Sequence, residues 1–95
     1  MKIVIIGAGE VGFHIAKALS EENYDTTVID ISPVKCTRTS ENLDVLVIQG
    51  DGASPGVVRQ AEVGKADILI AVTRIDEVNL IASQLAHELG ANKII

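Results

Sequence analysis

The sequence has 95 residues, of which 47% are hydrophobic, and its formal net charge is −5 at pH 7. This length suits one small domain, and the scattered Lys and Arg residues exclude the clustered basic surface of nucleic-acid-binding proteins. No apolar run reaches the roughly 18 residues of a membrane-spanning helix. The start of the chain lacks the layout of a signal peptide. We therefore expect a cytoplasmic domain that does not itself span the membrane.

Short apolar runs alternate with helical patterns along the chain. The predicted strands cover residues 2–6, 26–29, 45–48, 68–72 and 92–95. The predicted helices cover residues 10–22, 33–42, 55–62 and 75–89. This alternation indicates βαβ units and a parallel sheet. We predict a Rossmann-like α/β fold, a doubly wound parallel sheet of about five strands in the order 3-2-1-4-5 with helices on both faces.

Local signals mark several helix ends. Ser32 and Ser54 each precede a proline, a pattern typical of an N-cap followed by proline at the first helical position. Gly90 follows the last apolar position of the helix predicted over 75–89, where it can end that helix.

The chain stops on its fifth expected strand, whereas a doubly wound sheet usually has about six. We therefore interpret residues 1–95 as a nucleotide-binding domain that is truncated after the fifth strand.

A glycine-rich turn follows the first apolar run and opens the first predicted helix. Its members are Gly7, Ala8, Gly9, Glu10, Val11 and Gly12. In the G-x-G-x-x-G pattern, Gly7 permits the tight turn, Gly9 lets a pyrophosphate approach the backbone, and Gly12 lets the helix pack closely. The free N–H groups of the helix start favour a diphosphate. A plain strand–turn–helix corner is the alternative.

Asp30 ends the second apolar run, where an acidic side chain can accept hydrogen bonds from ribose hydroxyls. The alternative is an N-cap for the helix that begins at Pro33. A carboxylate at this position would repel a 2′-phosphate, and Ile31 and Ser32 supply no arginine to offset it. The sequence therefore favours NAD(H) over NADP(H).

Two further segments end strands at the same edge of the predicted sheet. Asp51 lies between Gly50 and Gly52, where it can either accept a hydrogen bond from adenine or serve as a turn residue. Thr73 and Arg74 end the fourth apolar run. Thr73 either caps the next helix or faces the second ribose or a phosphate.

Several reactive residue types receive no functional assignment. His14 and His87 lie on predicted helix surfaces and form no metal-ligand pattern, Cys36 is expected to be a small packing residue, and residues 38–40 are expected to be exposed. The only cysteine excludes an internal disulfide. Nucleophile, base and orienting residue do not occur in a recognisable pattern, so we do not expect an enzyme.

The motifs together resemble one protein family. They are GAGEVG at 7–12, VID at 28–30, VIQGD at 47–51, ADILIAVT at 66–73 and DEVN at 76–79. In this combination the chain resembles the regulatory nucleotide-binding domain of potassium transport systems, the TrkA or KTN/RCK type, over nearly all of its length. Only the glycine turn and Asp30 are shared widely with dehydrogenases. The turn at 50–51, Thr73 and the segment 76–79 therefore distinguish this family from them.

The resemblance implies a domain at the inner face of the cell membrane that controls a potassium-transporting membrane protein allosterically. The family ligand is NAD(H) in some members and ATP or ADP in others. By position, residues 7–11 would cover the pyrophosphate and Asp30 would bind ribose. Asp51 and Gly52 would lie beside adenine. Thr73 and Arg74 would lie near the distal half of the ligand. For Arg74, only the resemblance implies this role.

Glu10 distinguishes between these ligands. Family members that sense a triphosphate tend to have arginine at the fourth position of the turn, where this chain has Glu10. A carboxylate there is expected to repel a third phosphate, which favours NAD(H) over ATP.

The resemblance also leaves one competing class open. Family domains normally continue into another strand and helix that help form dimers, so we expect a homo-oligomer in the longer protein. The alternative function is the cofactor-binding half of an NAD-dependent oxidoreductase, since the same scaffold hosts both. The segments around Asp51 and Thr73 favour regulation.

Overall fold

The computed structural model describes all 95 residues. The strands are β1 (Lys2–Ile6), β2 (Asp25–Asp30), β3 (Leu46–Gln49), β4 (Ile68–Ala71) and β5 (Lys93–Ile94). The helices are α1 (Glu10–Glu21), α2 (Pro33–Asn42), α3 (Pro55–Gln60) and α4 (Asp76–Leu89), with a 3-10 turn η1 (Val63–Lys65) after α3. The strands form one sheet in the order β3-β2-β1-β4-β5, and every neighbouring pair is parallel. The predicted fold class and strand order are confirmed.

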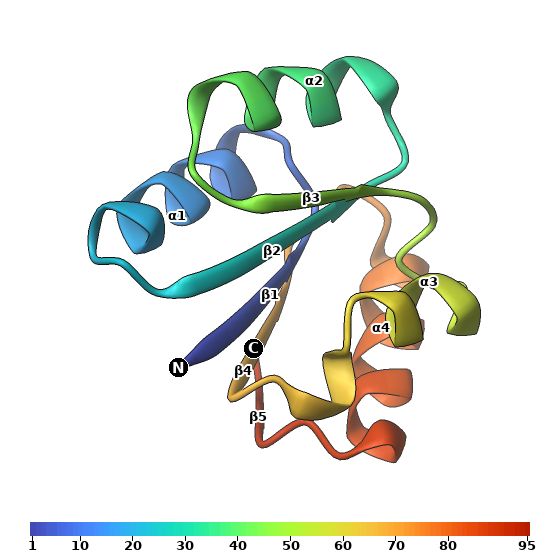
Figure 1. The fold of residues 1–95 in the computed structure, drawn as a ribbon. Coiled ribbons are helices and arrows are strands. Elements are labelled where there is room, and N and C mark those ends of the chain that lie inside the picture. The colour runs from blue at the N-terminus through green and yellow to red at the C-terminus, as the bar shows by residue number, and fades with distance from the viewer.

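Helices cover both faces of the sheet, with α1 and α2 on one face and α3 and α4 on the other (Figure 1). Successive side chains of a strand point to opposite faces. In β1, Val4 and Ile6 therefore join the apolar cluster under α3 and α4, while Ile3 and Ile5 join the cluster under α1. Because β1 is buried on both faces, its sequence reads as a continuous apolar run.

The order of the strands reverses at β1. Ile6, its last residue, is level with Ile29 of β2 and with Ala71 of β4. The turns that follow these three strands therefore leave the same edge of the sheet. The chain after β1 continues through α1 toward β2, while the chain after the neighbouring strand β4 continues through α4 toward β5 on the other side. This divergence opens a crevice between the ends of β1 and β4.

The predicted helix ends are largely confirmed. Ser32 is the N-cap of α2, and its hydroxyl accepts a hydrogen bond from the N–H of Lys35 at 3.2 Å. Ser54 occupies the N-cap position of α3 but makes no side-chain capping bond. Gly90 ends α4 in the left-handed conformation, with φ of 103°. A glycine adopts this conformation without the penalty of a Cβ atom.

Several element boundaries differ from the prediction. The fifth strand is only Lys93–Ile94, and Val45 and Val72 lie outside strands. Val72 follows the last register pair of β1 and β4, because β1 ends in the glycine turn. The helix predicted over 55–62 ends at Gln60, since Glu62 adopts a left-handed φ of 55° before η1.

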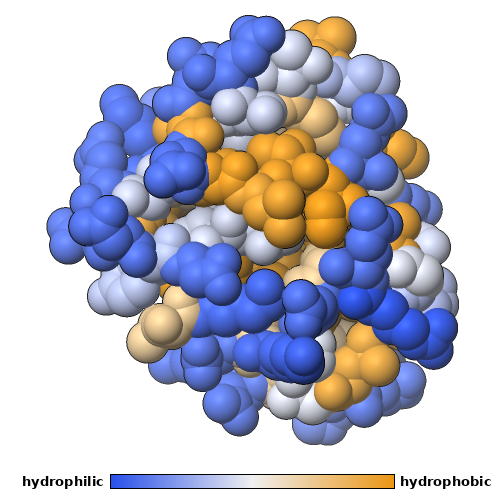
Figure 2. All heavy atoms as spheres, in the orientation of Figure 1, coloured by the Kyte–Doolittle hydropathy of each residue, from blue (hydrophilic) through white to orange (hydrophobic).

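The β3 edge carries exposed apolar surface. Figure 2 shows hydrophobic side chains gathered over β3 on the face turned to the viewer, and Leu46 is 60% exposed. In the strand order β3 pairs only with β2, so its outer side has no neighbouring strand.

Two glycines of the same turn are expected to respond differently to substitution. A Cβ atom on Gly12 would collide with the carbonyl oxygen of Gly7, whereas a Cβ on Gly9 would have no atom within 4 Å. We expect Gly12→Ala to lower the free energy of unfolding by about 1–3 kcal/mol, as overpacking does. The matched Gly9→Ala is expected to change it by about 0.5 kcal/mol or less.

Urea denaturation of both variants and the parent measures this difference. Equal losses at the two positions would contradict the packing role of Gly12.

Candidate nucleotide-binding site

A pocket opens at the carboxyl edge of the sheet, in the crevice where the strand order reverses. Its cavity volume is about 250 Å³. It is lined by the turns that follow β1, β2, β3 and β4, so residues far apart in sequence meet there. The predicted ligand-binding residues that line it are Gly7, Gly9, Asp30, Ile31, Asp51, Gly52, Thr73 and Arg74.

The glycines of the first turn have different physical roles. Gly7 has φ of +116°, and a Cβ there would lie 2.9 Å from the carbonyl oxygen of Val72. Gly12 packs against the carbonyl of Gly7. Gly9 lines the pocket and faces open space. Gly7 and Gly12 therefore build the turn, and Gly9 leaves room beside it.

The first turn of α1 offers backbone donors beside this space. Gly9 is the N-cap of α1 and supplies no side-chain cap, and the first N–H groups of a helix have no intrahelical partner. These donors and the positive end of the helix favour an anion. The arrangement is suited to hold a phosphate next to Gly9.

The other members of the turn do not line the pocket. Ala8 is fully buried, and its N–H donates to Oδ2 of Asp30 at 2.8 Å. Val11 is 61% exposed on the surface of α1. Glu10 begins α1, and its carboxylate lies near Arg38 and His14. The structure therefore separates Ala8, Glu10 and Val11 from the cavity that the sequence predicted they would share.

Asp30 joins two turns of the pocket. Its Oδ2 accepts the N–H of Ala8, and its Oδ1 accepts the N–H of Ser32, both at 2.8 Å. The N-cap alternative for Asp30 is wrong, because Ser32 caps α2. Each carboxylate oxygen can accept a further hydrogen bond. Asp30 therefore holds the pocket together and still presents oxygen atoms to a ligand.

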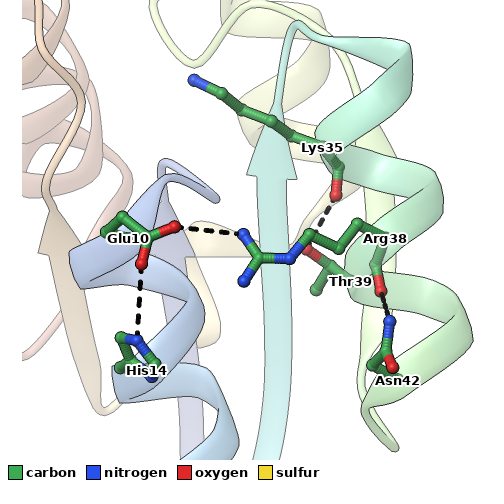
Figure 3. A network of polar contacts seen from close by, with 6 residues as sticks. All are labelled: Glu10, His14, Lys35, Arg38, Thr39 and Asn42. Carbon is green, nitrogen blue, oxygen red and sulfur yellow. Dashed lines mark hydrogen bonds and ion pairs between the residues drawn. The ribbon is translucent and has the colours of Figure 1, made fainter.

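Lys35 is a pocket residue that the sequence reasoning missed. It lies in the first turn of α2 and lines the cavity together with Asp30 and Ile31. Figure 3 shows its side chain extended away from the pair formed by Glu10 and Arg38. The N-cap at Ser32 was the signal, since a helix that starts there brings its first turn to the carboxyl edge of the sheet.

The pocket contains charged side chains of both signs. Lys35 and Arg74 line it, and neither forms an ion pair with a carboxylate. The carboxylate of Asp30 accepts two backbone N–H groups and that of Asp51 accepts one. Two unpaired cations therefore face the same cavity as the donors of α1.

Asp51 forms the turn after β3. Its Oδ1 accepts the N–H of Ala53 at 2.8 Å, and its carbonyl oxygen accepts the N–H of Ser54 at 3.0 Å. Gly52 is buried, and a side chain there would collide with Ile6. Asp51 therefore serves as a turn residue. Its exposed carboxylate also lines the pocket.

Asn79 fixes the wall formed by Thr73. Its Oδ1 accepts the hydroxyl of Thr73 at 2.6 Å and the N–H of Thr73 at 2.9 Å, and its Nδ2 donates to the carbonyl of Thr73 at 3.0 Å. Of the two alternatives for Thr73, the N-cap is wrong, because Ile75 is the N-cap of α4 and makes no side-chain capping bond. Asn79 belongs to the DEVN motif, but no pattern in the sequence predicted its hydrogen bonds to Thr73.

The expected exposure of residues 38–40 in α2 is also corrected. Residues 38–40 were expected to be exposed, yet Thr39 is fully buried and its hydroxyl donates to the carbonyl of Lys35 at 2.8 Å. Cys36 is buried, as predicted for a packing residue. Burial raises the pKa of the Cys36 thiol above its ordinary value, and the nearby charge of Asp30 raises it further. The thiol is therefore less ionised than a free cysteine.

The parallel sheet, the glycine turn and the crevice at the reversal of strand order define a Rossmann-type nucleotide-binding domain. Residues 3–95 match the model of the TrkA-N domain family, and the chain belongs to this family.

The chain is similar to potassium uptake proteins from bacteria and archaea. It is 46% identical over 89 residues to the Trk system potassium uptake protein TrkA of Azorhizobium caulinodans, covering 94% of this chain and 19% of the relative. It is 50% identical over 93 residues to a TrkA homologue of Methanosarcina mazei, covering 98% and 22%. The chain thus spans about one fifth of the length of the curated relatives it matches.

Solved structures share the fold. A carboxyl-terminal domain of Kef from Shewanella denitrificans in an AMP-bound form has a TM-score of 0.81 and 24% identity, over 99% of this chain and 56% of that one. The TrkA-N domain of the Escherichia coli inner membrane protein ybaL has a TM-score of 0.75 and 19% identity, over 99% and 85%. At this identity the likeness establishes the fold alone. None of the helices has the length and apolar composition needed to cross a membrane.

Replacement of Asn79 tests the wall of the pocket. We expect Asn79→Ala to lower the free energy of unfolding by about 1–3 kcal/mol, because it leaves half-buried polar groups of Thr73 without partners. Asn42→Ala is the matched control, since Asn42 also donates to a backbone carbonyl, that of Arg38 at 2.7 Å, but at an exposed site.

Denaturant unfolding of both variants checks the expectation. A loss at Asn42 as large as that at Asn79 would contradict the special role of Asn79.

Proposed function

We propose that this chain is the NAD(H)-binding regulatory domain of a potassium transport system. One observation carries the proposal: the space beside Gly9 is open and lies next to the free N–H groups of α1, at the reversal point of the sheet. The family membership supports the regulatory role, since the similar full-length proteins are named as Trk system potassium uptake proteins.

The residues around the pocket support an adenosine diphosphate group as the part of the ligand that lies in it. The cavity of about 250 Å³ is smaller than the roughly 300–1,000 Å³ of most small-molecule sites, so it encloses only part of a dinucleotide. In this proposal the phosphates lie beside Gly9, and Asp30 accepts the ribose hydroxyls. Asp51 and Gly52 lie beside adenine. The rest of the dinucleotide extends along Thr73 and Arg74.

Two solved structures with this fold carry adenosine phosphates, which supports the same ligand class. The Kef domain was solved with AMP, and the Bordetella bronchiseptica enzyme WbmG, with a TM-score of 0.78 and 15% identity, was solved with NAD. ATP and ADP share the adenosine phosphate group with NAD(H), so competition among these nucleotides is part of the test.

We propose that the ligand acts by shifting a conformational equilibrium. A ligand in the pocket touches the turns after β1, β2, β3 and β4 together, and the contact of Thr73 with Asn79 extends this set to α4. Such a ligand changes the relative stability of two states only through its different affinity for them. In this proposal the longer protein is a cytoplasmic homo-oligomer that passes the change to a potassium-transporting membrane protein.

We further propose that the domain is not an enzyme. The pocket lining contains neither His nor Cys, and the carboxylate of Asp30 already accepts two backbone N–H groups. The oxidoreductase alternative would require a second domain that supplies the reacting groups.

The experiment that tests the function replaces Gly9. We expect the parent chain to bind NADH and Gly9→Val to abolish binding, because the new side chain fills the space proposed for the phosphates. Gly56→Val is the matched control, since a Cβ on Gly56 would have only Oγ of Ser54 nearby, at 3.9 Å, and Gly56 lies in α3 outside the pocket lining.

Isothermal titration calorimetry with NAD⁺, NADH, ATP and ADP measures binding, and thermal unfolding confirms that each variant is folded. If Gly9→Val binds nucleotide as well as the parent does, the phosphate position is wrong.

The side chain of Asp30 is expected to set the preference for NAD(H) over NADP(H). We expect NAD(H) to bind about tenfold more tightly, because a carboxylate beside a 2′-phosphate is worth on the order of 1 kcal/mol or more of repulsion. Asp30→Asn is expected to reduce this preference while keeping an oxygen acceptor for Ala8. Lys35→Gln is expected to increase the preference for NAD(H), since the unpaired ammonium of Lys35 offsets the charge of the 2′-phosphate of NADP(H).

Calorimetric titrations of each variant with NADH and NADPH measure the ratio. Tighter binding of NADPH by the parent chain would overturn this assignment of Asp30.

A further inference from the structure

A charged cluster spans the gap between α1 and α2, outside the pocket lining (Figure 3). Oε1 of Glu10 lies 3.4 Å from Nη1 of Arg38, and Oε2 of Glu10 lies 3.6 Å from Nε2 of His14. The guanidinium carbon of Arg38 lies 4.1 Å from the centre of the Phe13 ring. The carboxylate of Glu10 therefore has a cationic partner on a different helix.

The position of Glu10 makes this pairing relevant to phosphate binding. Glu10 is the first residue of α1 and follows Gly9, which lines the pocket. Its carboxylate has the same sign of charge as a phosphate, and the positive end of the helix attracts both. A free Glu10 side chain would compete with a phosphate for this end of α1.

Arg38 is held where it can prevent that competition. Its guanidinium stacks on Phe13, a residue of α1 that is only 8% exposed, so the charge rests on a buried ring. Figure 3 shows Glu10 and Arg38 directed toward each other across the gap, while Lys35 extends away from them. In this arrangement the Glu10 carboxylate lies between α1 and α2 and does not line the cavity.

We propose that Arg38 is a positioning residue of the nucleotide site that acts through Glu10. It holds the Glu10 carboxylate away from the start of α1 and offsets its charge, so that the phosphates of the ligand are admitted. This inference rests on the proposed function. It replaces the simpler expectation that Glu10 faces the ligand directly.

The inference predicts a graded effect of Arg38→Gln. The variant frees the Glu10 carboxylate, so it weakens ligands in proportion to the charge on their phosphates: ATP most, then ADP, then NADH. The loss is expected to be about twofold for NADH and about fivefold for ATP, the range of exposed charge interactions. Added salt is expected to reduce both losses, because exposed charges are screened.

A double-variant comparison separates this role from others. The losses are expected to disappear when Arg38→Gln is made in a Glu10→Gln background, because no carboxylate remains to be released. Arg38→Lys is expected to retain most of the affinity, since it keeps the charge. Arg59→Gln is the control for the net charge, because Arg59 lies in α3 outside the pocket lining.

Calorimetric titrations of these variants with NADH, ADP and ATP decide the question, with thermal unfolding to establish that each is folded. An undiminished loss in the Glu10→Gln background would overturn the inference, because Arg38 would then act on the ligand directly or through packing alone. Unchanged affinity in Arg38→Gln would also overturn it, yet leave the proposed function standing. Absence of nucleotide binding by the parent would overturn both.

Discussion

The candidate site depends on two hydrogen bonds that the carboxylate of Asp30 accepts. One oxygen accepts the N–H of Ala8 in the glycine turn, and the other accepts the N–H of Ser32 before α2. The sheet brings the turns after β1 and β2 to the same edge, and these two hydrogen bonds connect the turns to each other. A loop residue with a buried N–H needs such an acceptor, since an unpaired buried donor is destabilising. The side chain proposed to bind ribose is thus also part of the framework of its own pocket.

The sheet supplies the rigid part of that framework. β1 is central, and its side chains enter both apolar clusters, so the glycine turn begins from a strand that is buried on both faces. On the other side of the crevice, Asn79 holds Thr73 by its backbone and its hydroxyl. The pocket walls are therefore fixed by hydrogen bonds between neighbouring loops and helices, and its open side is left at Gly9.

The fold could be predicted from the sequence because its signals are local. Apolar runs, a glycine turn and the N-cap at Ser32 each act within a few residues, and together they indicate the parallel sheet. The contacts missed were those between elements. Lys35 reaches the pocket, Arg38 stacks on Phe13, and Thr39 is buried only because of how α2 lies on its neighbours. A short polar helix such as α2 has too weak an apolar pattern to reveal which of its faces is covered.

The two glycines Gly9 and Gly12 separate the capacity to fold from the capacity to bind within a single turn. A side chain at Gly12 has no room, whereas a side chain at Gly9 meets only the open pocket. Under the proposed function, a single substitution at Gly9 therefore yields a descendant that keeps its scaffold but no longer responds to a nucleotide. In a duplicated or multidomain protein, one copy would become a purely structural unit by this route, while the other copy kept its ligand site.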